Sequence, residues 1–299
     1  MPVEGYRRIG RVDRSDARKT DLMSAGAPRL PLRALDCVMR GAGLTLWFLL
    51  ALLGGLLTPA SGEANERGCV TSDDPRIERV CFVDEPGHPK YGHEVLGDTP
   101  EWDVLEVHWS QGSAPERTTS VTRESQKNHV FEDIAPRLVD VDGKPGSEIV
   151  VVRSSFSKGA QLVVYGVRDG ALKILAETPY IGTRNRWLAP AAIADLDGDG
   201  HVELAFVDRP HLAKTLRVWR FQNDTLTSVS SMGGVTNHRI GEAFITGGLR
   251  TCADGPEIVT ADARWRQVVA IQLKNDTLIS RELGAYSAKR IKAVLACDE

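Results

Sequence analysis

The sequence lacks the short motifs that usually mark a reactive centre. It has five cysteines but no Cys-x-x-Cys pair, so neither a dithiol redox site nor a common zinc site is indicated. The serine run at 154–157 has no Gly-x-Ser-x-Gly context, which argues against a hydrolase nucleophile. His88, His93 and His108 are spaced too irregularly to predict zinc ligands. These absences favour a protein that is not an enzyme.

The uncharged apolar run at residues 44–57 is too short for a typical membrane span. The small residues of 59–62 follow it and suit cleavage by a signal peptidase. We expect a signal peptide over 39–62, with translation starting at Met39 and residues 1–38 being a disordered leader or an artefact of the start assignment. The alternative is that this segment is not cleaved and anchors the chain in a membrane. We expect no other membrane contact. The remaining domain, 63–299, is then periplasmic or secreted.

The charge of this remaining domain argues against some partners. Residues 1–62 contain nine Lys and Arg and five Asp and Glu, a net charge of +4. Because the whole chain has a net charge of −3, the domain without them has −7. A chain of this charge is not expected to bind nucleic acid or anionic membranes as its main role.

The clearest chemical motif is a nine-residue acidic loop. Carboxylate side chains occupy positions 1, 3, 5 and 9 of the loop, and these are Asp195, Asp197, Asp199 and Glu203. At position 7, His201 can offer its backbone carbonyl. Such a cluster suits Ca²⁺, which takes six to eight oxygen ligands in a flexible cage. The loop is not an EF-hand, because position 12 has no Glu and the flanks are short apolar runs typical of strands. We expect a β-hairpin tied by calcium.

Related loops recur along the chain. A weaker copy at 140–148 keeps Asp140, Asp142 and Glu148 but has Lys144 at position 5. A third copy ends at Glu257 and has lost the other acids. The three final glutamates are 55 and 54 residues apart, and each loop is followed by a strand, a tight turn and another strand. Four short strands in each unit of this length predict the blades of a β-propeller.

On these residues the chain resembles the FG-GAP/VCBS-type repeat proteins, over about residues 78–299. The resemblance implies blades with calcium loops between their first two strands, as in the head of integrin α chains, and it implies no reaction. The closest likeness is to compact bacterial exported members.

The C-terminus suggests how the ring closes. Residues 286–298 align with the start of the repeat at 181–195, so the chain ends where another first strand would finish. We therefore predict an all-β fold, a small propeller of about four blades whose first blade is closed by the C-terminal strand. The predicted blades are 292–298 with 78–123, then 134–180, 188–231 and 242–285. A fifth blade built from 85–102 is the alternative.

Four cysteines lie in the expected exported domain, and their even number in an oxidising compartment predicts disulfides. Alignment of the repeats places Cys81 and Cys297 near one another in the first blade, which would leave Cys69 with Cys252. The pairing Cys69–Cys81 with Cys252–Cys297 is nearly as compatible with the sequence.

Basic or titratable side chains precede each predicted first strand: His129, Arg186, His238 and Arg290. In a propeller these links pass close to the axis, so the four side chains can form a ring that binds an anion such as a carboxylate or acidic sugar. The alternative is that they brace the turns between blades by hydrogen bonds.

The sequence thus predicts an exported calcium-binding propeller, with structural Ca²⁺, that acts as a non-enzymatic scaffold for an unknown protein or a small anionic ligand. The alternative is an enzyme acting on an acidic or carbohydrate substrate in the propeller channel, because propellers host many activities.

Overall fold

The computed structural model describes residues 68–74, 76–112 and 117–298, all within one compact unit, 58–299. The expected leader and signal peptide lie outside these residues. Within them, no helix has the length and apolar character needed to cross a membrane.

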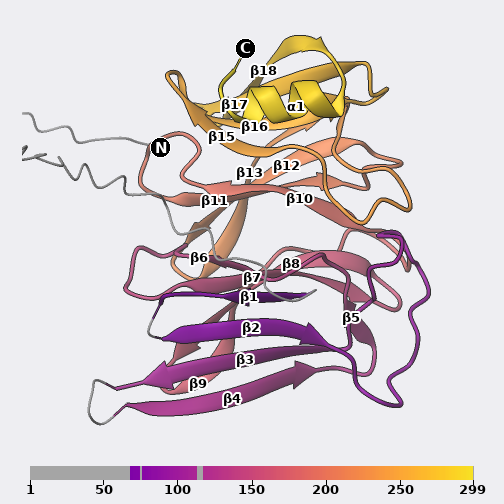
Figure 1. The fold of residues 1–299 in the computed structure, drawn as a ribbon. Helices are drawn as coiled ribbons and strands as arrows, with labels where there is room; N and C mark the ends of the chain where they lie inside the picture. Colours follow the sequence, from indigo (N-terminus) through magenta and orange to yellow (C-terminus); the bar gives the residue numbers. More distant parts are fainter. Residues whose placement is uncertain (1–67, 75, 113–116, 299) are drawn as a thin grey trace, which may run out of the picture. The chain divides into compact units, whose positions relative to one another are not determined.

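The described residues form four antiparallel sheets that follow one another in sequence order (Figure 1). The first sheet, in the order β1-β2-β3-β4, contains β1 (Cys69–Thr71), β2 (Ile77–Val83), β3 (Val104–Gln111) and β4 (Thr118–Ser125). The second contains β5 (His129–Phe131), β6 (Arg137–Val139), β7 (Glu148–Ser155), β8 (Gly159–Arg168) and β9 (Ala171–Glu177). The predicted all-β class is therefore confirmed.

The third and fourth sheets repeat this plan. The third contains β10 (Leu188–Ala194), β11 (Val202–Asp208), β12 (Thr215–Gln222) and β13 (Thr225–Gly233). The fourth contains β14 (Val235–Thr236), β15 (Gly248–Cys252), β16 (Gly255–Asp262), β17 (Gln267–Lys274) and β18 (Thr277–Ala285). The predicted repeats at 134–180, 188–231 and 242–285 contain most of the second, third and fourth sheets, but β5 and β14 lie before the predicted starts of the second and fourth.

The turns between the last two strands of each of these sheets have the predicted chemistry. Asn223 and Asp224 both have positive φ, 53° each, and so do Asn275 and Asp276, at 49° and 57°. A two-residue hairpin turn needs positive φ at both positions to match the strand twist, and Asn, Asp and Gly tolerate that conformation best. The third such turn, Asp169-Gly170, has the same backbone form.

Buried apolar side chains join each sheet to the next. One cluster combines the first and second sheets, a second combines the second and third, and a third combines the third and fourth. No cluster among the described residues joins the first sheet to the fourth. The long connection between β2 of the first sheet and β3 contacts the segment before β15 of the fourth sheet. There the Val95 carbonyl accepts from the Gly241 amide at 3.0 Å.

The connection between β2 and β3 includes residues 85–102, the stretch that the alternative prediction assigned to a fifth blade. Residues 85–102 form turns and loops with one isolated bridge, between Trp102 and Phe131, and Val95 and Leu96 pack into the cluster between the second and third sheets. The stretch is a long connection and not a fifth sheet.

The prediction that the C-terminal residues close the first blade as a strand is wrong. Residues Ala288–Leu295 form the helix α1, whose buried Ile291 and Val294 pack on the fourth sheet. Ser287 caps the helix, its hydroxyl accepting from the Arg290 amide at 3.0 Å. The spacing of the two buried residues, i and i+3, places them on one helical face. The place of the first strand in the first sheet is taken by β1.

The disulfides follow from these positions. Cys69 and Cys81 are directly paired across β1 and β2, and Cys252 at the end of β15 is bonded to Cys297 just after α1. The preferred pairing of Cys81 with Cys297 is wrong, because the C-terminal segment lies on the fourth sheet; the alternative pairing is the one observed. Two disulfides are typical of proteins in an oxidising, extracytoplasmic environment.

Candidate metal centre

The loop at 195–203 connects β10 to β11, as predicted, and is curled by its own acids. Asp195 accepts from the amides of Gly198 (2.7 Å) and Gly200 (3.0 Å), and Asp199 accepts from the amide of His201 (2.8 Å). Gly198 and Gly200 have φ of 82° and 87°, which a residue with a Cβ rarely adopts. These hydrogen bonds and backbone angles hold the loop in a curled form.

Three carboxylates of this loop converge. Asp195, Asp197 and Glu203 each offer an oxygen within 4.8 Å of the others. Glu203 is fully buried, and its Oε2 accepts from the Leu196 amide at 2.8 Å. Burial raises the pKa of Glu203. This arrangement can hold a metal ion, and its donors are all oxygens, the ligands of hard cations.

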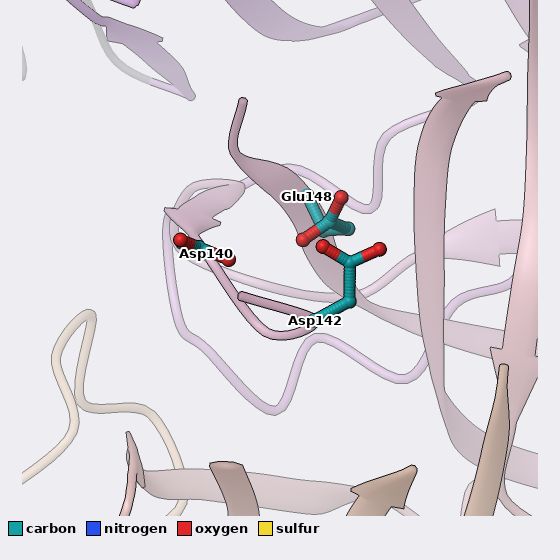
Figure 2. Close-up of side chains that lie close together, drawn as sticks. All are labelled: Asp140, Asp142 and Glu148. Atoms are coloured by element: carbon teal, nitrogen blue, oxygen red, sulfur yellow. The ribbon is translucent and has the colours of Figure 1, made fainter. Parts of the chain in front are cut away.

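The weaker copy at 140–148 has the same arrangement, shown in Figure 2. Asp140, Asp142 and Glu148 again offer oxygens within 4.8 Å of one another. Lys144 reaches back to Asp142, with 2.9 Å between Nζ and Oδ2. Although burial opposes it, this ammonium group helps to hold the pKa of Asp142 below its usual range. A lysine thus supplies part of the positive charge that an ion would bring.

Each of these acidic groups also pairs with an arginine that sequence reasoning missed. Arg220 of β12 lies 2.6 Å from both Glu203 and Asp197 and 3.4 Å from Asp199. In the second sheet Arg168 of β8 lies 2.6 Å from Asp142 and 3.0 Å from Glu148. The two arginines are two positions apart in the aligned repeats, so they do not appear as a shared motif. Because residues i and i+2 share a strand face, both still reach the loop.

The third copy keeps only the pairing of the final glutamate. Glu257 is buried and lies 2.5 Å from Arg250 and 2.9 Å from Arg281. Arg250 also donates to the Val294 carbonyl of α1 at 2.9 Å. Within the described part of this sheet two arginines pair with the buried glutamate, at the loop whose other ligands the sequence predicts to be lost.

The side chain of His201, at position 7, turns to Gln222, with 2.9 Å between the two Nε2 atoms. This contact leaves the His201 carbonyl as the group expected to serve an ion.

The four residues of the expected anion ring have separate partners. His129 contacts the Tyr180 hydroxyl (2.6 Å), Arg290 donates to the Leu283 carbonyl (2.6 Å), and Arg186 donates to the Asn185 carbonyl (3.3 Å). His238 contacts His211 (3.0 Å) and the Glu242 carbonyl (2.8 Å). Among the described residues, no hydrogen bond, ion pair or ring contact joins any two of the four. Arg290 in particular lies on α1 and not before a strand.

Comparison of the chain with known protein families gives no match, and comparison with curated proteins gives none either.

Proposed function

We propose that this protein is an exported, calcium-stabilised β-propeller-type repeat protein that acts as a non-enzymatic scaffold for a ligand or partner. The observation that carries the proposal is the 195–203 loop, where three carboxylates converge on a hairpin already closed by their hydrogen bonds to backbone amides. Calcium bound there would tie β10 to β11.

Arg220 already contacts most of the carboxylates that the ion would use. Asp195 has no ion pair among the described residues, whereas Asp197, Asp199 and Glu203 all contact the Arg220 guanidinium. Calcium bound by Asp195, Asp197 and Glu203 would compete with Arg220 for Asp197 and Glu203. The ion would add positive charge to a cluster that one arginine balances only in part, which fits a structural ion.

A shared cavity supports the propeller arrangement. In a propeller the first strand of each blade faces the central axis. Residues of β6 and β10, together with Gly248 at the start of β15, line one cavity of about 500 Å³. β6, β10 and β15 pair with β7, β11 and β16, the position that the first strand of a blade would take. In the second and fourth sheets β5 and β14 share this position. Its walls are mainly apolar, and Phe244 on its edge is exposed, so the cavity is a candidate surface for the scaffold function.

The test is the thermal unfolding of the protein with and without calcium. Selective binding to the folded state adds about 2.7 kcal/mol when the ion is at 100 times its Kd. For a domain of this size that corresponds to a rise in Tm of about 5–10 °C. Asp197→Ala should remove most of the rise, because it removes a converging ligand.

The matched control is Asp254→Ala, which removes an exposed aspartate from the corresponding turn of the fourth sheet, where the ligands are lost. This variant should keep the wild-type response to calcium. An equal Tm in calcium and in excess chelator would refute the calcium proposal.

A further inference from the structure

A smaller cavity, of about 170 Å³, lies where four chain segments meet. Its polar lining comes from His93 in the β2–β3 connection, Asn185 and Arg186 before β10, and Arg209 and His211 after β11. Arg209 is paired with Asp208 at 2.6 Å. The exposed side chains of Leu212 and Ile240 add an apolar edge. Neither the acidic loops nor the cavity between the first strands contributes to it.

His93 presents its Nε2 atom to this cavity. Its Nδ1 lies 2.5 Å from one oxygen of Glu132, a buried carboxyl group whose other oxygen accepts from the Ser154 hydroxyl at 2.5 Å. Burial raises the pKa of Glu132, and the contact with His93 opposes this effect. The contact occupies Nδ1 of His93, and Nε2 of the same ring has no hydrogen-bond partner among the described residues.

His211 presents an acceptor. The Glu242 carbonyl lies 2.8 Å from Nε2 of His238, so that nitrogen must carry a proton. The Nδ1 of neutral His238 then accepts from Nε2 of His211, at 3.0 Å. This relay leaves Nδ1 of His211 with a lone pair and no protein partner in the described part of the chain. Burial, with the neighbouring His238, lowers the pKa of His211 to about 4, so the ring is neutral at pH 7.

Asn185 and Arg186 complete the set. The side-chain oxygen of Asn185 is buried and has no hydrogen-bond donor among the described residues. Arg186 forms no ion pair with a carboxylate in the described residues, and its charge is thus available to a ligand. The cavity combines the guanidinium of Arg186 and the Nε2 atom of His93 with two acceptors, Nδ1 of His211 and the side-chain oxygen of Asn185.

We propose that this cavity binds a small hydroxylated carboxylate, such as an acidic monosaccharide. The carboxylate would accept from Arg186 and His93, and a hydroxyl group would donate to His211 or Asn185. The inference goes beyond the scaffold function and does not depend on calcium, so either proposal can fail without the other.

Isothermal titration of the full chain with D-glucuronate tests the proposal. D-glucose is the comparison ligand with hydroxyls but no charge, and acetate is the comparison ligand with a charge but no hydroxyls. Glucuronate should bind at least tenfold more tightly than either. Arg186→Gln should weaken glucuronate at least tenfold. His211→Phe keeps a ring beside Trp187 and removes the acceptor, so it should weaken glucuronate severalfold and leave acetate unchanged.

Arg217→Gln is the matched control, because it removes the same charge from a residue that pairs with Asp208 and does not line the cavity. It should bind glucuronate like the wild type, and the Tm of every variant shows whether it folds. Three results would overturn the proposal: no binding of glucuronate, equal binding by the folded Arg186→Gln variant, or binding of Zn²⁺ through His93 and His211 without any binding of glucuronate.

Discussion

At the residue scale, three of the sheets share one buried glutamate whose negative charge must be paired with a positive group. Glu148, Glu203 and Glu257 occupy the same place in three successive sheets, and each pairs with at least one arginine. A buried carboxylate left without a partner is costly, so this pairing is needed whether or not an ion is bound. The acid at position 5 is more exposed, with 38% of the Asp199 side chain accessible against 5% for Asp142 and 11% for Asp197 at position 3. A change at position 5 leaves no buried charge unpaired, and this is the position where Lys144 replaces the acid in the weaker copy.

Lys144 provides a direct test of this view. Lys144→Asp restores the acid at position 5 and removes the ammonium group that contacts Asp142. We expect a slightly lower Tm in chelator, because negative charges then crowd the loop, and a larger rise of Tm with calcium. Titration calorimetry should show the number of tightly bound calcium ions increase from one to two.

The control is Lys173→Asp, which reverses the charge of an exposed lysine in β9 that pairs with Asp169 outside the acidic loops. It should leave the calcium stoichiometry at one. If Lys144→Asp also leaves it at one, the 140–148 loop is not a degraded calcium site.

At the element scale, the C-terminal residues form the helix α1 on the fourth sheet and not the closing strand that was expected in the first sheet. It lies on the fourth sheet through Ile291 and Val294, receives a hydrogen bond from Arg250, and is bonded through Cys297 to the end of β15. The three contacts fix the C-terminus to the sheet that precedes it in sequence.

The two disulfides should differ in their effect on stability. Cys252 and Cys297 are separated by 45 residues, and Cys69 and Cys81 by 12. In the chain-entropy account, closing the longer loop stabilises the fold by about 4 kcal/mol and closing the shorter one by about 3 kcal/mol. Chemical denaturation should therefore show a greater loss for the Cys252→Ser/Cys297→Ser double variant than for Cys69→Ser/Cys81→Ser. The reverse order would mean that α1 adds little to the stability of the fourth sheet.

At the scale of the whole molecule, one buried and two half-buried histidines make the free energy of unfolding depend on pH. Burial is the main cause that lowers the pKa of His129 and His211 to about 4, and it also lowers that of His238. In the unfolded chain a histidine has a pKa of about 6.5. Between pH 6.5 and 4 the unfolded chain thus binds more protons, so stability from these residues is present above pH 6.5 and is lost as the pH falls.

Comparison of the wild type with His211→Phe isolates one of these terms from the carboxylates that titrate nearby. The variant should lose less stability between pH 6.5 and 4.5, by at most about 1.4 kcal/mol per pH unit. Partial exposure of the ring reduces this figure. Urea denaturation at several pH values measures it, and parallel pH profiles for the two proteins would contradict the assignment.

Much of the fold was predictable from local pattern. The repeated strands, the turns at Asn223-Asp224 and Asn275-Asp276, and the hairpin at 195–203 depend on residues close together in sequence. The error at 286–298 arose because an alignment to the start of a repeat outweighed a helical spacing of two apolar residues. Eight residues are too few for periodicity alone to separate a helix from a strand.

The sequence by itself determined the all-β class, the repeat and the acids of the two loops, because each is written in neighbouring residues. Only the tertiary structure decided which charges balance those acids, which cysteines pair and which histidines meet. Arg220 reaches Glu203 from the adjacent strand, and His93 reaches Glu132 from 39 residues away. Such contacts depend on how strands and long connections pack against one another. The spacing of residues along the chain therefore does not predict them.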